Sequence, residues 1–380
     1  MFCWYGQSTI GMDEGNQTMK RVLALLGILL CLSIIMPVGA EEPIAYDPAV
    51  CAEFDDGREL SEACAAMIAA FPRPLVEEIP FDGYTLDTYS FWRVGPDPVP
   101  TFDGPGGNVT GEIPRGFNFV HAVDLSVEGW LQIVDGRWLR QDDARWTQPS
   151  FFKGVTLTED VELPFAWVLD MSSIPVSRYP GGPQDAETGR FLRRYERVNI
   201  FATAHDEEGW RWYMIGPNQW VEQRFVAKVQ TVERPEGVSG RWVAVDLYEQ
   251  TLVAYEDDTP VYATLISSGL ARTETNEGLF TVWARLERDG MSGATGAPNA
   301  YALQNVPWVM YFDEGISLHG TYWHDYFGYR QSRGCVNLSI SDAKWVFRFL
   351  EGAEPNDDGE LENHVYVYSS GTYGVTATGL

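Results

Sequence analysis

The feature that most constrains the fold of this chain is an internal repeat with an offset of eighty residues. A Gly-Trp pair at residues 129–130 recurs at residues 209–210, and each pair is followed by a second tryptophan before an aliphatic residue, at Trp138 and Trp220. Around both pairs, short β-prone runs alternate with turns that contain Gly and Pro. Two copies of one unit explain this pattern better than coincidence does, so the sequence predicts two successive small β units.

The repeated Gly-Trp and Trp-aliphatic pattern resembles that of bacterial SH3-like modules, small β-barrels that are often attached to cell-wall enzymes. The resemblance implies one module over residues 82–158 and a second over residues 159–230. Four tryptophans of the pattern are expected to fill the interiors of the barrels: Trp130, Trp138, Trp210 and Trp220. Exposed aromatic side chains that bind the wall would then be others, such as Trp146 or Trp212.

A second stretch, residues 316–338, holds a cysteine and a histidine in a suggestive arrangement. Cys335 is the only cysteine in the last three hundred residues, and His319 lies sixteen residues upstream of it. A free thiol is mostly protonated at neutral pH, so it needs a base such as an imidazole before it can act as a nucleophile. The pair therefore predicts nucleophilic catalysis by Cys335 with His319 as the proton acceptor.

Two residues directly before the cysteine favour the same chemistry. Gly334 allows the backbone to bend closely, which would leave amides of the turn free to bind an oxyanion. Arg333 places a fixed positive charge next to the nucleophile, where it would support a thiolate. We therefore expect Gly334 and Arg333 to assist Cys335.

The same stretch resembles the signature of the L,D-transpeptidases, the YkuD-type catalytic domain. That signature has a His-Gly pair and, about a dozen residues later, Ser/Thr-His-Gly-Cys, a hydrophobic residue, and Asn or Arg. Here His319-Gly320 is followed by Ser-Arg-Gly-Cys-Val-Asn at residues 332–337, so order, spacing and residue types agree. One departure is Arg333, which stands where the family usually has a second histidine. The resemblance extends over residues 241–368.

The resemblance implies a specific reaction. Cys335 would attack a carbonyl of a peptidoglycan stem peptide, and an acceptor amine would resolve the acyl-enzyme. His319 would exchange the proton, with its ring oriented by the carbonyl of Gly320, and backbone amides of Gly334 and Cys335 would form the oxyanion site. The reaction needs no cofactor, and carbapenem-type inhibitors are expected to acylate Cys335.

Other residues of the stretch are candidates for contacts with the substrate. They lie around the cysteine and the histidine: Tyr322, Trp323, His324, Tyr326, Ser332 and Asn337. The aromatic side chains could equally pack the loop, and Ser332 and Asn337 could hold the turn. The spacing of the histidines and Cys335 lacks the clip typical of a metal site, so we expect no metal.

Two alternatives to a transpeptidase stay open. An L,D-carboxypeptidase would use the same residues with water as the acceptor. A non-catalytic wall-binding protein would instead depend on the SH3-like pair, although intact Cys335 and His319 favour an enzyme. The sequence does not identify the acceptor.

The N-terminal segment has the pattern of a secretory signal peptide. Lys20 and Arg21 precede an apolar run over residues 22–36 and a small-residue cleavage site at residues 38–40. We expect residues 1–40 to be removed, with 1–18 an overextended start, although an uncleaved anchor is the alternative. The prediction is an extracytoplasmic, cell-wall-associated protein with no stable membrane span after cleavage. In that compartment Cys51 and Cys64 could form a disulfide.

The charge of the chain excludes some classes of partner. The formal net charge is −27 over 380 residues. A nucleic-acid-binding protein or a polybasic membrane contact needs a basic face instead. We therefore expect no nucleic acid as a partner.

The fold predicted from these patterns is mainly β. Residues 41–81 form an N-terminal segment with a helix near 60–71, followed by the tandem SH3-like barrels. A linker at 231–240 leads to a β-sandwich-like catalytic domain at 241–368 and a tail at 369–380. A short helix after the cysteine turn is predicted at 341–350, with Ser341 as its N-cap.

Overall fold

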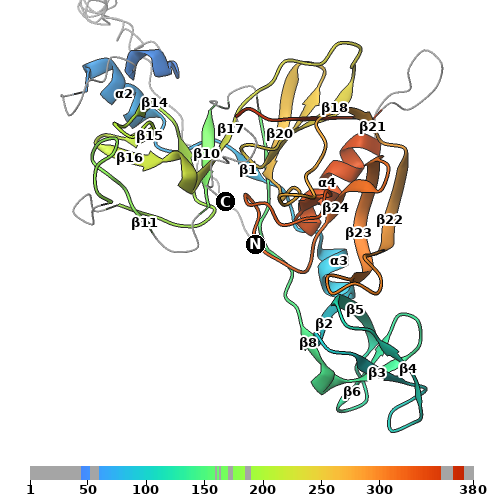
Figure 1. Ribbon diagram of the computed structural model, residues 1–380. Helices are drawn as coiled ribbons and strands as arrows, with labels where there is room; N and C mark the ends of the chain where they lie inside the picture. Colours follow the sequence, from blue (N-terminus) through green and yellow to red (C-terminus); the bar gives the residue numbers. More distant parts are fainter. Residues whose placement is uncertain are drawn as a thin grey trace, which may run out of the picture. The chain divides into compact units, whose positions relative to one another are not determined.

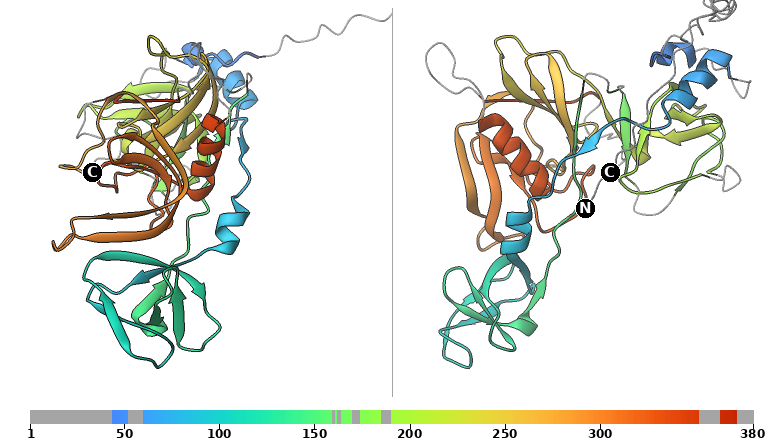
Figure 2. Two further views of the ribbon diagram at one scale, coloured as in Figure 1. Left: turned by 90° about the vertical axis from the view of Figure 1, so that its right-hand side faces the viewer. Right: turned by 180° about the vertical axis from the view of Figure 1, so that it is seen from behind.

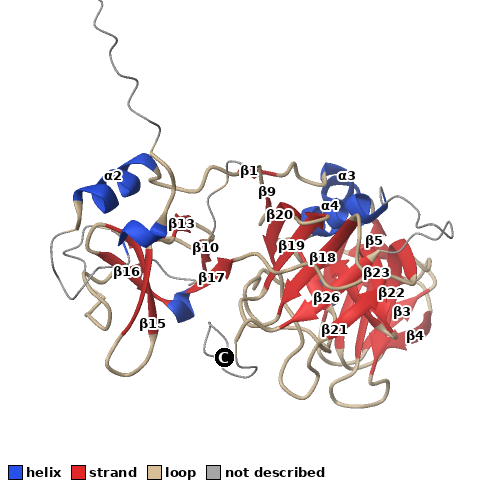
Figure 3. Cartoon of the chain, turned by 90° about the horizontal axis from the view of Figure 1, so that it is seen from above, coloured by secondary structure: helices blue, strands red, loops and turns tan. Residues whose placement is uncertain are grey.

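The computed structural model describes residues 44–51, 60–158, 161, 164–169, 174–184, 190–351 and 363–371. The chain divides into two compact units, residues 1–45 and 46–380, and all the described helices and strands lie in the second. The predicted signal peptide lies outside the described residues, as does most of the predicted tail. Strands predominate over helices (Figure 1, Figure 3). None of the described helices is long and apolar enough to cross a membrane.

The C-terminal region contains a sheet built around a parallel pair of strands. In this sheet β18 pairs in parallel with β26 and antiparallel with β19. The strand order is β1-β9-β20-β19-β18-β26-β21, where β1 (Glu77–Glu78) and β9 (Val155–Thr156) come from earlier in the chain. Its strands from this region are β18 (Arg241–Asp246), β19 (Thr251–Glu256), β20 (Thr259–Leu265), β21 (Gly278–Thr281) and β26 (His364–Tyr368). The central strands are buried almost throughout, as expected of strands covered on both faces.

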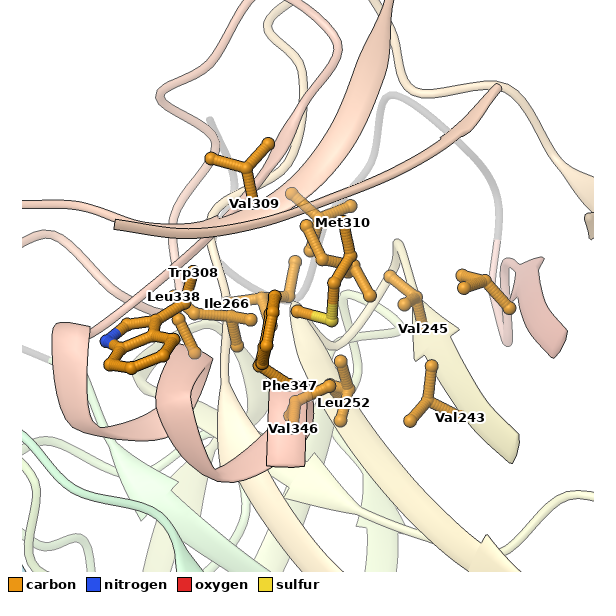
Figure 4. Close-up of a cluster of buried hydrophobic side chains, with 14 of the residues drawn as sticks. Val243, Val245, Leu252, Ile266, Trp308, Val309, Met310, Leu338, Val346 and Phe347 are labelled. Carbon is orange, nitrogen blue, oxygen red and sulfur yellow. The ribbon is translucent and has the colours of Figure 1, made fainter. Parts of the chain in front are cut away.

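A second sheet carries the predicted cysteine and histidine. Its strands from this region are β22 (Ala284–Gly293), β23 (Tyr301–Asp313), β24 (Ile316–Gly320) and β25 (Val336–Leu338). The helix α4 (Ile340–Glu351) packs against β23 and β24 (Figure 2). Side chains from β18, β19, β23 and α4 meet in one hydrophobic core, including Val245, Leu252, Met310 and Phe347 (Figure 4). The predicted short helix after the cysteine is therefore present.

The N-cap of α4 differs from the prediction. Ser339, not Ser341, caps the helix, because the Ser339 hydroxyl accepts from the amide of Asp342 at 3.2 Å. The Ser341 hydroxyl instead accepts from the amide of Asp82 at 3.0 Å. Asp342 is fully buried and accepts from Tyr262, Thr264 and the Gly154 amide. Burial raises the pKa of its carboxyl to about 6.

The two predicted repeats show the same order of elements with one exception. The first contains β2 (Ser90–Val94), β3 (Val99–Phe102), β4 (Val109–Ile113), β5 (Phe117–Asp124), β6 (Trp130–Ile133), β7 (Trp138–Arg140), η2 (Gln141–Asp143) and β8 (Ala144–Trp146). The second contains β10 (Phe165–Val168), β11 (Ile174–Pro175), β12 (Phe191–Leu192), β13 (Arg197–Asn199), β14 (Ala202–His205), β15 (Arg211–Gly216), β16 (Gln219–Glu222), η4 (Gln223–Phe225) and β17 (Val226–Val229). The exception is that two strands of the second, β13 and β14, correspond to the single strand β5 of the first.

The strand pairing is also repeated. In the first repeat β2 pairs with β5 and β8, and in the second β10 pairs with β13 and β17. A 3₁₀ turn precedes the last strand in both copies. The internal repeat of the sequence is therefore a repeat of structure. Among the described residues, the paired strands of neither repeat close into a ring, so the structure does not show the predicted barrels.

The prediction that four tryptophans fill the interiors of the repeats was wrong. Trp130 and Trp138 are half-buried and lie outside the buried cluster of the first repeat, and Trp210 is 37% exposed. Trp220 is buried, but in a cluster separate from the interior of the second repeat. Trp146 is exposed as predicted, whereas Trp212 is buried. Trp212 is covered because a separate segment packs on its face of β15.

That covering segment is N-terminal to both repeats. It comprises η1 (Pro48–Cys51) and α2 (Glu62–Ala70), and a disulfide joins Cys51 to Cys64. Cys64, Met67 and Ile68 pack against Trp212 and Trp220 in one cluster. The helix predicted near residues 60–71 is therefore present, and its packing on the second repeat explains the buried Trp212.

Strand pairing also crosses the predicted boundary between the first repeat and the catalytic domain. β5 pairs in parallel with β23, so both lie in one eleven-stranded sheet. Short strands β1 (Glu77–Glu78) and β9 (Val155–Thr156) extend the other sheet beyond β20. The helix α3 (Gly83–Thr88) begins at the N-cap Asp82, whose buried carboxylate bonds to Lys344 and Trp308. The first repeat and the C-terminal region thus share backbone ladders and polar contacts.

Candidate active site

The pairing of β24 with β25 brings the predicted nucleophile and base to one place. The two strands are parallel, with Leu318 opposite Val336 and His319 opposite Asn337. Cys335 directly precedes β25 and lies next to Ser317, whose hydroxyl donates to the Cys335 sulfur at 3.7 Å. Ser317 and His319 are two residues apart on a strand, so their side chains point to the same face.

Cys335 is a free, half-buried thiol. Burial raises its pKa above the usual value of 9.0, and the hydrogen bonds from Ser317 act in the opposite direction. The sulfur also lies 3.9 Å from the carbonyl oxygen of Gly315. Because the raising effect prevails, the Cys335 thiol is protonated at neutral pH.

His319 is buried, with 2% of its surface exposed. Its Nδ1 lies 3.2 Å from the carbonyl oxygen of Gly320, which can only accept, so Nδ1 carries the proton and Nε2 is the free acceptor. Burial lowers the pKa of the imidazole to about 4. His319 is therefore neutral at pH 7 and available as a base. The predicted orienting role of Gly320 agrees with this geometry.

The turn before the cysteine is held by side-chain hydrogen bonds. Gly334 has φ +115°, a conformation that L side chains rarely adopt. Its carbonyl accepts from Thr275 at 2.7 Å, and its amide donates to the Ser332 hydroxyl at 3.1 Å. Ser332 in turn donates to the carbonyl of Cys335. The amide of Gly334 is thus already engaged, contrary to the expectation that it is free for an oxyanion.

Arg333 does not lie where it was predicted to act. Its side chain is exposed, and the guanidinium lies over the ring of Tyr301, 4.7 Å from the centroid. The groups in contact with the thiol are Ser317 and Gly315 instead. Among the described residues, the structure therefore shows no direct contact between Arg333 and the thiol, because stacking on Tyr301 holds the guanidinium, although Arg333 lines the same cavity.

His324 and Asn337 form a second polar pair beside His319. His324 Nδ1 accepts from the amide of Tyr326 at 3.1 Å, so its proton is on Nε2. Nε2 lies 2.9 Å from Nδ2 of Asn337, and Oδ1 of Asn337 has no partner among the described residues. Exchanging the two atoms of this amide lets its oxygen accept from Nε2. Burial is the main cause that lowers the pKa of His324 to about 3. Both residues are therefore neutral and fixed.

Of the two adjacent aromatic candidates Tyr322 and Trp323, only Trp323 lies at the surface of the site. Trp323 is half-buried beside His319, with ring centroids 5.5 Å apart. Tyr322 is fully buried, stacks on Phe91 at 3.9 Å and donates to the carbonyl of Gln304 at 2.7 Å. The prediction that Tyr322 lines a substrate groove was wrong, because alternation along the chain turns it into the core.

A cavity of about 460 Å³ opens over these residues. Eight of the sequence-predicted residues line it: His319, Trp323, His324, Tyr326, Ser332, Arg333, Cys335 and Asn337. The motif did not point to the others: Arg93, Phe117, Leu270, Met291, Tyr301, Leu303, Gly315, Ile316 and Gln331. It also missed Ser317, which the two-residue spacing from His319 on a strand would have revealed. In the described parts of the chain, no group of three or more His, Cys, Asp or Glu could hold a metal ion.

This geometry belongs to a segment that matches a known family. Residues 240–367 match the family model of the L,D-transpeptidase catalytic domain, YkuD. That part of the chain is therefore a catalytic domain of the L,D-transpeptidase type, which confirms the resemblance of the sequence there. The match does not extend to the two repeats. No curated protein matches the chain in sequence.

Several solved structures are similar to parts of the chain. An L,D-transpeptidase from Stackebrandtia nassauensis is 25% identical over 38% of this chain and 60% of that one, with a TM-score of 0.26. A mutant L,D-transpeptidase from Enterococcus faecium is 27% identical over 34% of this chain and 50% of that one, with a TM-score of 0.29. L,D-transpeptidase 3 from Mycobacterium tuberculosis, solved with a faropenem-derived adduct, is 16% identical over 46% and 75%, with a TM-score of 0.30. The chain thus spans 60% and 50% of the first two structures.

The raised pKa of Cys335 leads to a testable pH profile. The rate of alkylation by iodoacetamide should keep rising up to and beyond pH 9, because the thiolate fraction limits the reaction. Ser317→Ala should move the profile to higher pH, since the serine hydrogen bonds lower the thiol pKa. Labelling of Cys335 is followed by mass spectrometry.

The exposed Ser292 on β22 provides a matched control, and Ser292→Ala should leave the profile unchanged. A plateau of alkylation over roughly pH 5 to 8 would show a resting thiolate–imidazolium pair and contradict the neutral pair described here.

Proposed function

We propose that this protein is a peptidoglycan L,D-transpeptidase. The observation that carries the proposal is a free thiol and a neutral imidazole at the ends of adjacent parallel strands, in one cavity, within residues that match the family model. The substrate is a stem peptide, and the product is a cross-link in the cell wall. The acceptor amine distinguishes this reaction from that of an L,D-carboxypeptidase, in which water takes its place.

The reaction begins from the neutral pair. As the Cys335 sulfur attacks the peptide carbonyl, Nε2 of His319 takes the thiol proton. The imidazolium then gives that proton to the nitrogen of the departing amino acid, and the C–N bond breaks to leave a thioester. The acceptor amine attacks the thioester, its proton passes to His319 and then to the sulfur, and the free thiol returns.

The surroundings stabilise the charges that develop. The carbonyl of Gly320 holds the Nδ1 proton, which stabilises the imidazolium while it exists. Because the Gly334 amide is held by Ser332, we assign the oxyanion contact to the amide of Cys335. The same acylation chemistry applies to carbapenems, which we expect to modify Cys335.

The lowered pKa of His319 sets the acid limit of catalysis. The value of kcat/KM for transfer from a tetrapeptide donor to an amine should stay level down to about pH 5. It should fall only near pH 4, where His319 becomes protonated and can no longer accept a proton. His319→Ala should lower kcat by about 10²–10⁴-fold, and Cys335→Ala should abolish transfer. Mass spectrometry of the products checks these rates.

An acid limb with a midpoint near pH 6.5 would contradict the assignment of a buried, neutral His319 as the base. Release of the terminal amino acid without incorporation of the amine would instead identify the carboxypeptidase alternative.

We further propose that the protein is exported and that its two repeats are SH3-like modules. In this proposal the modules bind the cell wall. A cavity of about 980 Å³ on the second repeat supports this role. Tyr179 and Trp210 line it, with 48% and 37% of their surfaces exposed. Asp206 shapes the loop by accepting from the Trp210 amide at 2.8 Å and the Trp212 indole at 2.7 Å.

Binding to purified sacculi tests this second role. In a Cys335→Ala background, Tyr179→Ala with Trp210→Ala should reduce the bound fraction about tenfold, because stacking surfaces of the cavity are lost. Trp283→Ala, which removes an indole that is 63% exposed in the C-terminal region, serves as the control and should bind normally. Equal binding of all three proteins would refute a wall-binding role of this cavity.

A further inference from the structure

The strand pair β2–β5 of the first repeat has two different apolar faces. On β2, Trp92 and Val94 point into the interior of the repeat, while Phe91 points into the core of the catalytic domain. On β5, Val120 faces the repeat and Phe119 faces the catalytic core. Because side chains alternate along a strand, Arg93 lies on the same face of β2 as Phe91, and Phe117 lies on the same face of β5 as Phe119. Both therefore face the catalytic side.

Backbone and side-chain contacts fix this face against the catalytic domain. β5 pairs in parallel with β23, with Phe117 opposite Tyr301. Next to this ladder, the amide of His121 donates to the Gln304 side chain at 3.0 Å. Phe91 stacks on Tyr322, the neighbour of the catalytic loop. The first repeat is therefore built into the wall of the active site.

As a result, two arginines line the active-site cavity over neighbouring aromatic rings. Arg93 lies over the ring of Phe117, 5.6 Å from the centroid, and Arg333 lies over the ring of Tyr301 at 4.7 Å. Both arginines line the cavity that contains Cys335. Since Phe117 and Tyr301 are register partners, the two rings that carry the guanidinium groups occupy neighbouring strand positions.

The charge around this pair is unusual for the chain. The sequence has 54 acidic and 27 basic residues, yet none of the residues that line the cavity is Asp or Glu. Within the described residues, neither guanidinium has a carboxylate partner. Stacking on the rings restricts both side chains without satisfying their N–H donors. The site is thus positive, partly preorganised and without an internal anion.

We propose that Arg93 and Arg333 form a carboxylate-binding subsite for the peptide that reacts at Cys335. A guanidinium presents a planar fork of donors that matches a carboxylate, and two such groups favour a substrate with a free carboxylate over a neutral one. The first repeat therefore contributes to substrate selection. The identity of the ligand as a peptide rests on the proposed function, whereas the anion preference of the cavity does not. The carboxylate could belong to the acyl donor or to the acceptor.

Alkylation of Cys335 measures the anion preference without any turnover. Iodoacetate is an anion and iodoacetamide is its neutral counterpart, so the ratio of their rates cancels changes in the thiol pKa. Arg93→Gln and Arg333→Gln should each lower the ratio about threefold at low salt, and the double variant about tenfold. Arg140→Gln, which removes an arginine stacked on Phe102 of the same repeat, is the matched control and should leave the ratio unchanged.

Peptide substrates then assign the carboxylate. Arg93→Gln should raise KM about tenfold for the peptide whose carboxylate it binds, with little change for the same peptide as its amide. Amidation of the donor and of the acceptor in separate assays identifies which one is recognised. Arg93→Lys should keep most of the alkylation ratio but not the low KM, since it retains charge and loses the fork.

The outcomes separate the two proposals. A lowered alkylation ratio without peptide turnover by the wild type would support the subsite and count against the transpeptidase. An unchanged ratio in the double variant would overturn the subsite, whatever the turnover.

Discussion

The parallel pairing of β24 with β25 is the constraint on which the site depends. It sets the end of one strand beside the start of the other, so that Ser317, His319 and Asn337 lie around Cys335. No sequence-local contact would hold residues sixteen positions apart in this way. The helix α4 follows β25 directly and packs against β23 and β24, which anchors the pair to the hydrophobic core. Reactivity at the cysteine is therefore a consequence of a strand register.

Burial acts on both members of the reactive pair and in opposite senses. It raises the pKa of the Cys335 thiol and lowers the pKa of the His319 imidazole, so both groups rest in their neutral forms. A thiol and a base that are both uncharged cost less to bury than an ion pair. In the proposed reaction the thiolate would be generated only as it attacks, and the Gly320 carbonyl would stabilise the imidazolium.

The sequence predicted those features that depend on local pattern. Cys335, His319, Gly320 and the helix after the turn follow from motif and spacing, and the repeat follows from self-similarity. It did not predict that Tyr322 is buried or that Arg333 stacks on Tyr301, because both depend on partners distant in the chain. Arg93 was missed for the same reason, since only the pairing of β5 with β23 places it at the cavity.

We propose that Cys335 is an acyl-accepting nucleophile assisted by His319, and the intact mass of the protein after incubation with a carbapenem tests this role most directly. We expect one adduct on the wild type, much slower formation on His319→Ala, and none on Cys335→Ala. An adduct on Cys335→Ala, or none on a wild type whose thiol still titrates, would contradict this role of Cys335.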